Sequence, residues 1–244
     1  LTQLINRFLT PMTQVILDRK GTIDKYMGDC IMAFWNAPLE VPDHALQACH
    51  SALVMMKELE ALNLELVKEA KTGDSTTDSL RIGIGINTGT ACVGNLGSEQ
   101  RFDYSALGDS VNLASRLEGQ SKTYGVDILL TEDTYRSASQ LAAVELDLIQ
   151  VVGKSEPTRI FALLGDEEVC TSTDFVRLVE LQNEMLNTYR ARQWEKTLEL
   201  TDRLKQMQFE GMERYYSMFS ERVLEYRATP PESNWGGVER RLMK

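Results

Sequence analysis

The pattern of apolar residues changes character once along this chain, near residue 165, and that change limits what the chain can fold into. Before it, β-rich runs alternate with stretches whose apolar residues recur every three to four positions. After it, every sustained pattern is helical. Strands interleaved with helices favour a mixed sheet with helices on one face. We therefore predict an α+β domain, a polar linker, a helical region and an irregular tail, over residues 1–165, 166–173, 174–228 and 229–244.

The expected elements follow from periodicity and turn residues. Glycine followed by aspartate at 28–29 predicts a hairpin tip. The glycines of RIGIGIN, at 81–87, predict a strand that another backbone approaches closely. We expect helices over 1–17, 42–70, 109–122, 174–191, 194–208 and 211–227, strands over 22–27, 30–35, 81–87, 128–131, 148–152 and 158–164, and a second hairpin around 89–97.

Charge and cysteine content exclude several classes of function. The chain has 36 acidic and 26 basic residues and a formal net charge of -10. Surfaces that bind nucleic acids or anionic membranes usually need a basic field, so we expect neither partner. The four cysteines lack CxxC spacing, which argues against a zinc site or a disulfide framework and favours a reducing, cytoplasmic setting. No window is long and apolar enough to suggest a membrane span.

A few polar residues stand where they could bind a phosphorylated ligand. Asp29 occupies the predicted hairpin tip, and Lys25 precedes it on the first strand. Asn112 and Arg116 are four residues apart, so a helix would place both on one face. Lys154 follows Gly153, and we expect the two to lie in a turn between two strands. Each residue alone is more often a turn former or a solvated side chain, and no P-loop accompanies them. The residues alone therefore indicate a mixed α/β protein with, at most, a metal–phosphate site.

Four stretches taken together resemble a known family. In chain order they are GTIDKYMGDCIMAFWNAP, RIGIGINTGTACVGNLGS, FDYSALGDSVNLASRLE and VVGKSEPTRIFAL. Their order and separation resemble those of the class III adenylate and guanylate cyclases. The resemblance implies a palm-like, ferredoxin-like βαββαβ domain without its first strand, and a homodimer with active sites between the subunits. The later helices resemble the tetratricopeptide-like tail that follows some bacterial cyclase domains.

The resemblance also implies a role for each candidate residue. Lys25 corresponds to the lysine that reads the adenine ring, and Ser105 to the second base-selecting position. Asn112 would orient the ribose, Arg116 would stabilise the transferring phosphoryl group, and Lys154 would bind the triphosphate. A lysine at position 25 favours ATP, because guanine presents a donor where adenine presents an acceptor. The implied activity is that of an adenylate cyclase, which makes 3',5'-cyclic AMP and pyrophosphate from ATP in signal transduction.

The implied cofactor is a pair of Mg²⁺ or Mn²⁺ ions in each site, and Asp29 corresponds to the second of two metal-binding aspartates. The first such aspartate belongs to a strand that would precede residue 1. We therefore expect this chain alone to lack activity, and we expect it to be the cytoplasmic part of a longer protein, such as a membrane-anchored sensor.

Other readings stay open at this point. A regulatory pseudo-cyclase could bind a nucleotide without chemistry, although such a module has no physical reason to keep Asp29, Asn112, Arg116 and Lys154. A guanylate cyclase would share the same scaffold. A diguanylate cyclase would carry a GG[DE]EF hairpin, which the sequence YMGDC at 26–30 does not match. An interaction scaffold acting through the helical region would leave the four stretches unexplained.

Overall fold

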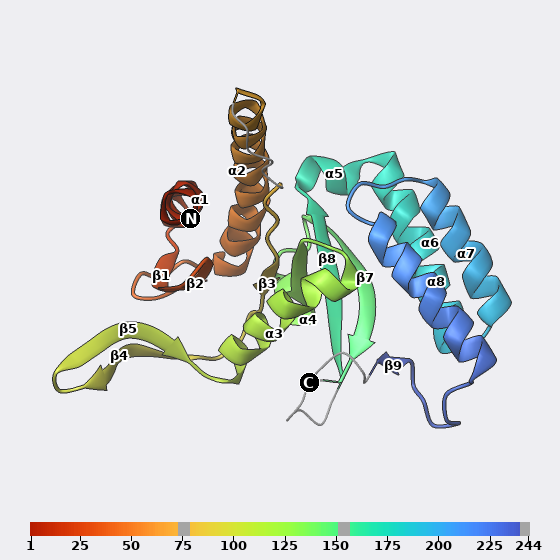
Figure 1. Ribbon diagram of the computed structural model, residues 1–244. Helices are drawn as coiled ribbons and strands as arrows, with labels where there is room; N and C mark the ends of the chain where they lie inside the picture. The colour runs from red at the N-terminus through yellow and green to blue at the C-terminus, as the bar shows by residue number, and fades with distance from the viewer. Residues whose placement is uncertain (73–78, 151–156, 240–244) are drawn as a thin grey trace. The chain divides into compact units, whose positions relative to one another are not determined.

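The computed structural model describes residues 1–72, 79–150 and 157–239, which form two compact units. The first unit contains Leu1–Ile82 and Gly89–Val111. The second contains Gly83–Thr88 and the chain from Asn112 onwards. Figure 1 labels the elements of both units. Within the described residues, no helix combines the length and the apolar character that crossing a membrane requires.

Two helices and two hairpins make the first unit. Helix α1, Thr2–Asp18, packs against α2, His44–Thr72. Their apolar faces share a small core, to which Phe8 and Met12 contribute from α1 and Leu59, Leu62 and Leu66 from α2. This packing is what the helical periodicity of both segments predicts.

The first hairpin has the expected position. Strand β1, Thr22–Met27, pairs antiparallel with β2, Cys30–Phe34, and the turn is Gly28–Asp29. Gly28 has φ of 68°, a left-handed conformation that glycine adopts without steric cost. The sequence therefore predicts this hairpin correctly.

The second hairpin differs from the prediction. Strands β4, Cys92–Ser98, and β5, Arg101–Leu107, pair over their whole length, so the turn lies at Glu99–Gln100 rather than within 89–97. Gly94 and Gly97 are paired residues inside β4 and not turn residues. The prediction was wrong because the long ladder with β5 overrides the local turn preference of these glycines.

The second unit is built on a five-stranded mixed sheet, which confirms the α+β class. The strand order is β3-β6-β8-β7-β9. The pairs β3–β6 and β7–β9 are parallel, and β6–β8 and β7–β8 are antiparallel. The strands are β3 Ile84–Ile86, β6 Ile128–Thr131, β7 Ala142–Ile149, β8 Thr158–Gly165 and β9 Val238–Glu239.

Helix α3, Asp109–Tyr124, approaches β3 closely, as the glycines of RIGIGIN predict. A Cβ atom on Gly85 would lie 2.2 Å from the carbonyl oxygen of Ala114, and one on Gly83 would lie 2.0 Å from Ser121 Oγ. The lack of a side chain at Gly83 and Gly85 thus lets the helix lie close to this segment. The short helix α4, Glu132–Ser137, follows β6.

After β8 the described chain continues with four helices: α5 Glu167–Thr171, α6 Thr173–Arg190, α7 Trp194–Gln206 and α8 Glu213–Ala228. Helix α5 lies in the segment predicted to be a linker, and β9 in the predicted irregular tail. One continuous core joins the later helices to the sheet, since Leu178 and Phe219 belong to the same buried cluster as Leu146. The helical region and the sheet therefore share one interior.

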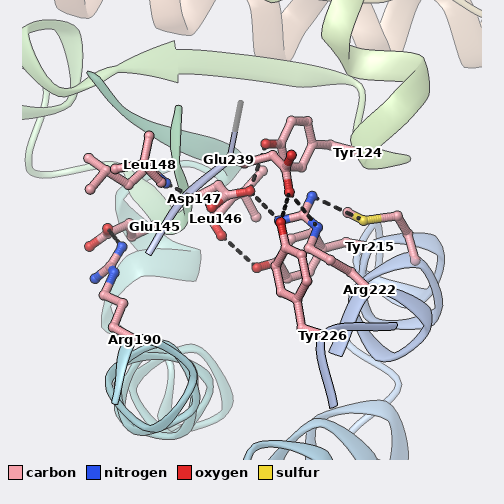
Figure 2. Close-up of polar contacts among 12 residues, drawn as sticks. Tyr124, Glu145, Leu146, Asp147, Leu148, Arg190, Tyr215, Arg222, Tyr226 and Glu239 are labelled. Atoms are coloured by element: carbon pink, nitrogen blue, oxygen red, sulfur yellow. Dashed lines mark hydrogen bonds and ion pairs between the residues drawn. The ribbon is translucent and has the colours of Figure 1, made fainter. Parts of the chain in front are cut away.

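A buried polar network crosses this interior (Figure 2). The carboxylate of Asp147 on β7 accepts hydrogen bonds from Tyr124 Oη at 2.7 Å and from Arg222 Nη1 at 2.5 Å. Arg222 Nε lies 3.4 Å from Glu239 Oε2, and Tyr226 Oη donates to the same carboxylate oxygen at 3.1 Å. Buried charges need such partners, because an unpaired charge in a core is strongly destabilising. The network thus connects α3, β7, α8 and β9.

Candidate active site

An irregularity in β1 places two charged side chains together. Ile23 pairs with Ala33 and Lys25 pairs with Met32, which leaves Asp24 as an extra residue in the strand. At such a β-bulge two residues oppose one on the neighbouring strand, and a side chain is redirected. Asp24 and Lys25, which would point to opposite faces of a regular strand, instead form an ion pair, with Lys25 Nζ 3.2 Å from Asp24 Oδ1.

The redirected carboxylate of Asp24 contacts β5. Ser105 Oγ donates to Asp24 Oδ2 at 2.6 Å, and the backbone N–H of Ala106 donates to the same oxygen at 3.0 Å. The Asp24 side chain is fully buried, and Ser105 is 4% exposed. The first unit therefore brings Lys25 and Ser105, the two predicted base-reading residues, to the same carboxylate.

These contacts affect the ionisation of Asp24. Burial raises the pKa of its carboxyl group, but the hydrogen bonds from Ser105 and Ala106 and the charge of Lys25 outweigh that effect and leave the pKa below its usual value. Asp24 is thus a carboxylate at neutral pH. The side chain of Lys25 is 42% exposed, so its ammonium group is accessible to a ligand.

Asp29 lies in the exposed turn between β1 and β2, as predicted. Among the residues that the structure describes, no three His, Cys, Asp or Glu side chains gather into a group able to hold a metal ion. Magnesium is commonly held by only one or two carboxylates together with the phosphates of a substrate. An exposed carboxylate on a tight hairpin fits that mode of binding and does not fit a cage made of protein ligands alone.

Asn112 and Arg116 lie one turn apart on α3, and both are exposed. Leu113 and Leu117, each one residue further along and so about 100° around the helix, are buried in the core of the second unit. The core thus fixes which face of the helix carries the amide and the guanidinium. A planar guanidinium fork suits phosphate oxygens, and the amide can both donate and accept. Lys154 lies outside the described residues.

Sequence reasoning did not identify Asp24. It is an acidic residue between Ile23 and Lys25 in a predicted strand, where it looks like an ordinary solvated side chain. Its partner Ser105 is 81 residues away in the sequence. The available signal was that Asp24 and Lys25 are adjacent charged residues in a strand where alternation would bury one of them.

Comparison with known proteins supports a single family. Residues 1–165 match the adenylate and guanylate cyclase catalytic domain family. Adenylate cyclase 1 of Rhizobium meliloti (strain 1021) is 32% identical over 172 residues, which are 70% of this chain and 25% of that protein. An adenylate cyclase of Anabaena cylindrica is 36% identical over 163 residues, 65% of this chain and 31% of that protein. The chain thus spans about a quarter to a third of these relatives.

Solved structures agree. The guanylyl cyclase Cya2 is 31% identical with a TM-score of 0.58, covering 68% of this chain and 80% of that one. The adenylyl cyclase CyaB from P. aeruginosa is 32% identical with a TM-score of 0.58, covering 68% and 83%. This chain therefore belongs to the family of adenylate and guanylate cyclase catalytic domains.

Proposed function

We propose that the chain is the catalytic domain of an adenylate cyclase, which converts ATP to 3',5'-cyclic AMP and pyrophosphate. The observation that carries the choice of ATP is the exposed ammonium group of Lys25, held beside Ser105 and Asp24. An ammonium group can only donate hydrogen bonds. It therefore suits the ring N1 of adenine, an acceptor, and not the N1–H of guanine. The relatives from Rhizobium meliloti and Anabaena cylindrica, both named adenylate cyclases, support the same substrate.

The reaction is an in-line displacement at the α-phosphate. A bond forms between the ribose 3'-oxygen and the α-phosphorus, the bond to the bridging oxygen of the β-phosphate breaks, and pyrophosphate leaves with that electron pair. The 3'-hydroxyl proton is released as the new bond forms. In this proposal Asn112 orients the ribose, Arg116 stabilises the charge on the transferring group, and Lys154 binds the triphosphate.

Divalent ions, two Mg²⁺ or Mn²⁺ in each site, would promote loss of the 3'-hydroxyl proton and neutralise phosphate charge. Asp29 would supply one of their carboxylate ligands. Its position on a hairpin turn, supported by the β1–β2 ladder, suits a ligand that must keep its place while substrate enters.

The proposed working form is a homodimer with two equivalent sites, as two-fold symmetry requires. In each site one subunit would supply Asp29, and its partner would supply Lys25, Ser105, Asn112 and Arg116. A single subunit would then be inactive. The helical region is proposed to be tetratricopeptide-like, and the protein to act in signal transduction, with a sensor in the remainder of the polypeptide.

The deciding experiment is product analysis with the full-length protein, given ATP and GTP separately with Mg²⁺ or Mn²⁺. Cyclic AMP as the main product supports the proposal. Cyclic GMP as the main product would replace it with a guanylate cyclase, a reading that the similarity to Cya2 keeps in view. Nucleotide binding without either product would indicate a regulatory pseudo-cyclase. The substitution Lys25→Glu should shift preference from ATP towards GTP, and an unchanged ratio would remove the basis for the choice of substrate.

A further inference from the structure

We infer that Asp24 is a positioning residue for base selection, which acts on the purine through the hydroxyl group of Ser105. The inference rests on the proposed function, because it concerns the same nucleotide site. It adds a residue to that site and explains how a serine can select one base.

The bond between Ser105 and Asp24 can run in one direction only. An ionised carboxylate has no hydrogen to donate, so the hydrogen of the Ser105 hydroxyl group points to Asp24 Oδ2, 2.6 Å away. The Ala106 N–H, which donates to the same oxygen, holds the carboxylate in place. With its hydrogen engaged, Ser105 Oγ can offer a further ligand only its lone pairs. Ser105 thus becomes an acceptor.

This matters because a free hydroxyl group would not discriminate. Adenine carries a 6-amino group, which donates, whereas guanine carries a 6-oxo group, which accepts. A rotating serine could serve either base by turning its hydrogen towards or away from it. A serine oxygen that can only accept forms a hydrogen bond with the amino group of adenine. Against guanine it would face the oxo oxygen, which is also an acceptor, and no hydrogen bond forms. Asp24 thus gives the second base-selecting position the preference that a serine alone lacks.

The bulge in β1 makes the arrangement geometrically available. The extra residue places Asp24 on the same side of the strand as Lys25, and one carboxylate then faces both base-reading groups through its two oxygens. Lys25 is long and 42% exposed, so its ammonium group can move from Asp24 to a bound ring. Ser105 is 4% exposed, so its side chain has little room to move, and a bound base would meet the Ser105 oxygen in one fixed position. Lys25 and Ser105 therefore differ in conformational freedom as well as in hydrogen-bonding capacity.

The comparison of ATP with purine riboside triphosphate isolates the purine 6-position, whereas ITP also carries the N1–H that opposes Lys25. The full-length protein is given ATP, purine riboside triphosphate, which lacks the 6-amino group, and ITP, which carries a 6-oxo group. For the wild type we expect kcat/KM for ATP to exceed that for purine riboside triphosphate by about threefold to tenfold, the usual worth of one hydrogen bond. In Asp24→Ala this ratio should approach one, and use of ITP relative to ATP should rise, because no acceptor is left to fix the direction of the Ser105 hydroxyl group; asparagine would not serve, since its amide oxygen would still accept from Ala106 and Ser105.

Further variants separate positioning from general damage. Ser105→Ala should also bring the ratio close to one, and adding Asp24→Ala to it should change the ratio no further, since Asp24 acts only through Ser105. Ser105→Thr keeps the hydroxyl group and should keep the ratio. Asp133→Asn removes an exposed carboxylate in the second unit and should leave the ratio at its wild-type value. Thermal melting checks the folding of each variant, and Asp24→Val provides a second side chain without an acceptor if the alanine variant is unstable.

The outcomes distinguish this inference from the proposed function. If the wild type makes cyclic AMP but folded Asp24→Ala keeps the wild-type ratio of kcat/KM for ATP to that for purine riboside triphosphate, the inference is overturned and the adenylate cyclase proposal stands. If the wild type makes no cyclic nucleotide, the proposed function fails. Competition binding with the same three nucleotides then gives the ratio of affinities, and a value unaffected by Asp24→Ala overturns the inference there as well.

Discussion

Arg222 of α8 and Asp147 of β7 form an ion pair inside the second unit, with 2.5 Å between Nη1 and Oδ2. Their side chains are 9% and 2% exposed, and Glu239 lies 3.4 Å from the same guanidinium group. The rings of Tyr124 and Phe219 flank the guanidinium, at 5.8 and 5.6 Å from its carbon to the ring centroids. A positive charge is thus enclosed where helix and sheet meet.

Substitution Arg222→Ala should therefore destabilise the protein strongly. It would leave the carboxylates of Asp147 and Glu239 buried without their counter-ion, a change that typically costs about 3–5 kcal/mol of unfolding free energy. Urea unfolding of the chain measures the cost. Arg227→Ala, at an exposed position near the end of the same helix, should change the free energy by less than about 0.5 kcal/mol. Equal effects of the two substitutions would contradict the role of the buried network.

Two glycines allow a matched test of the contact between α3 and β3. In Gly85→Ala the new methyl group would meet the carbonyl oxygen of Ala114 at 2.2 Å, so strand and helix must separate, at a cost of about 1–3 kcal/mol. In Gly119→Ala the methyl group meets nothing within 4 Å, and the gain in helix propensity should stabilise the protein by about 0.5–1 kcal/mol. Thermal melting curves should move in opposite directions. A shift of the same sign in both would count against the packing described.

The lowered pKa of Asp24 predicts a pH dependence of stability. A carboxyl group with a lower pKa in the folded than in the unfolded state stabilises the fold fully above its ordinary pKa, near 4, and loses that contribution as the pH falls through the folded value. The wild type should therefore lose more stability than Asp24→Asn between pH 6 and pH 3. Denaturation midpoints measured across that range give the difference. Parallel curves for both proteins would mean that Asp24 does not titrate as described.

The proposed dimer makes a stoichiometric prediction. Asp29→Ala and Arg116→Ala should each inactivate the full-length protein, because each substitution removes a residue that both sites of the dimer need. After the two are mixed and allowed to exchange subunits, half of the dimers should be heterodimers with one intact site, which gives about a quarter of wild-type activity. Product formation before and after mixing measures the recovery. Two inactive variants that never complement would argue that all the catalytic residues come from one subunit.

The sequence predicts those parts of the structure that depend on neighbouring residues. Gly28 and Asp29 define their turn locally, and the period of Leu113 and Leu117 sets the inner face of α3, which also fixes the outer position of Asn112 and Arg116. The turn between β4 and β5 was mispredicted, because a ladder of seven residue pairs outweighs two glycines. Strand β9 was missed, since its two residues depend on pairing with β7, far away in the sequence.

Asp24 could not be predicted for a similar reason. Whether a strand contains an extra residue depends on how it pairs with its neighbour, and the contacts of the redirected carboxylate depend on β5. Neither property is visible in the segment TIDKYM. The functional roles of Lys25, Ser105, Asn112, Arg116 and Asp29 remain predictions that the experiments above address.

The residue pairs on either side of the bulge do not depend on residue 24. Ile23 already faces Ala33 and Lys25 already faces Met32, so a chain that lost residue 24 would keep the same ladder, with each remaining side chain on its present side. The carboxylate is carried by the one position of β1 that hairpin pairing does not need. In the proposed site, base selection would therefore depend on the length of this strand as well as on its composition, and deletion of residue 24 is expected to remove a charge and to leave the hairpin paired.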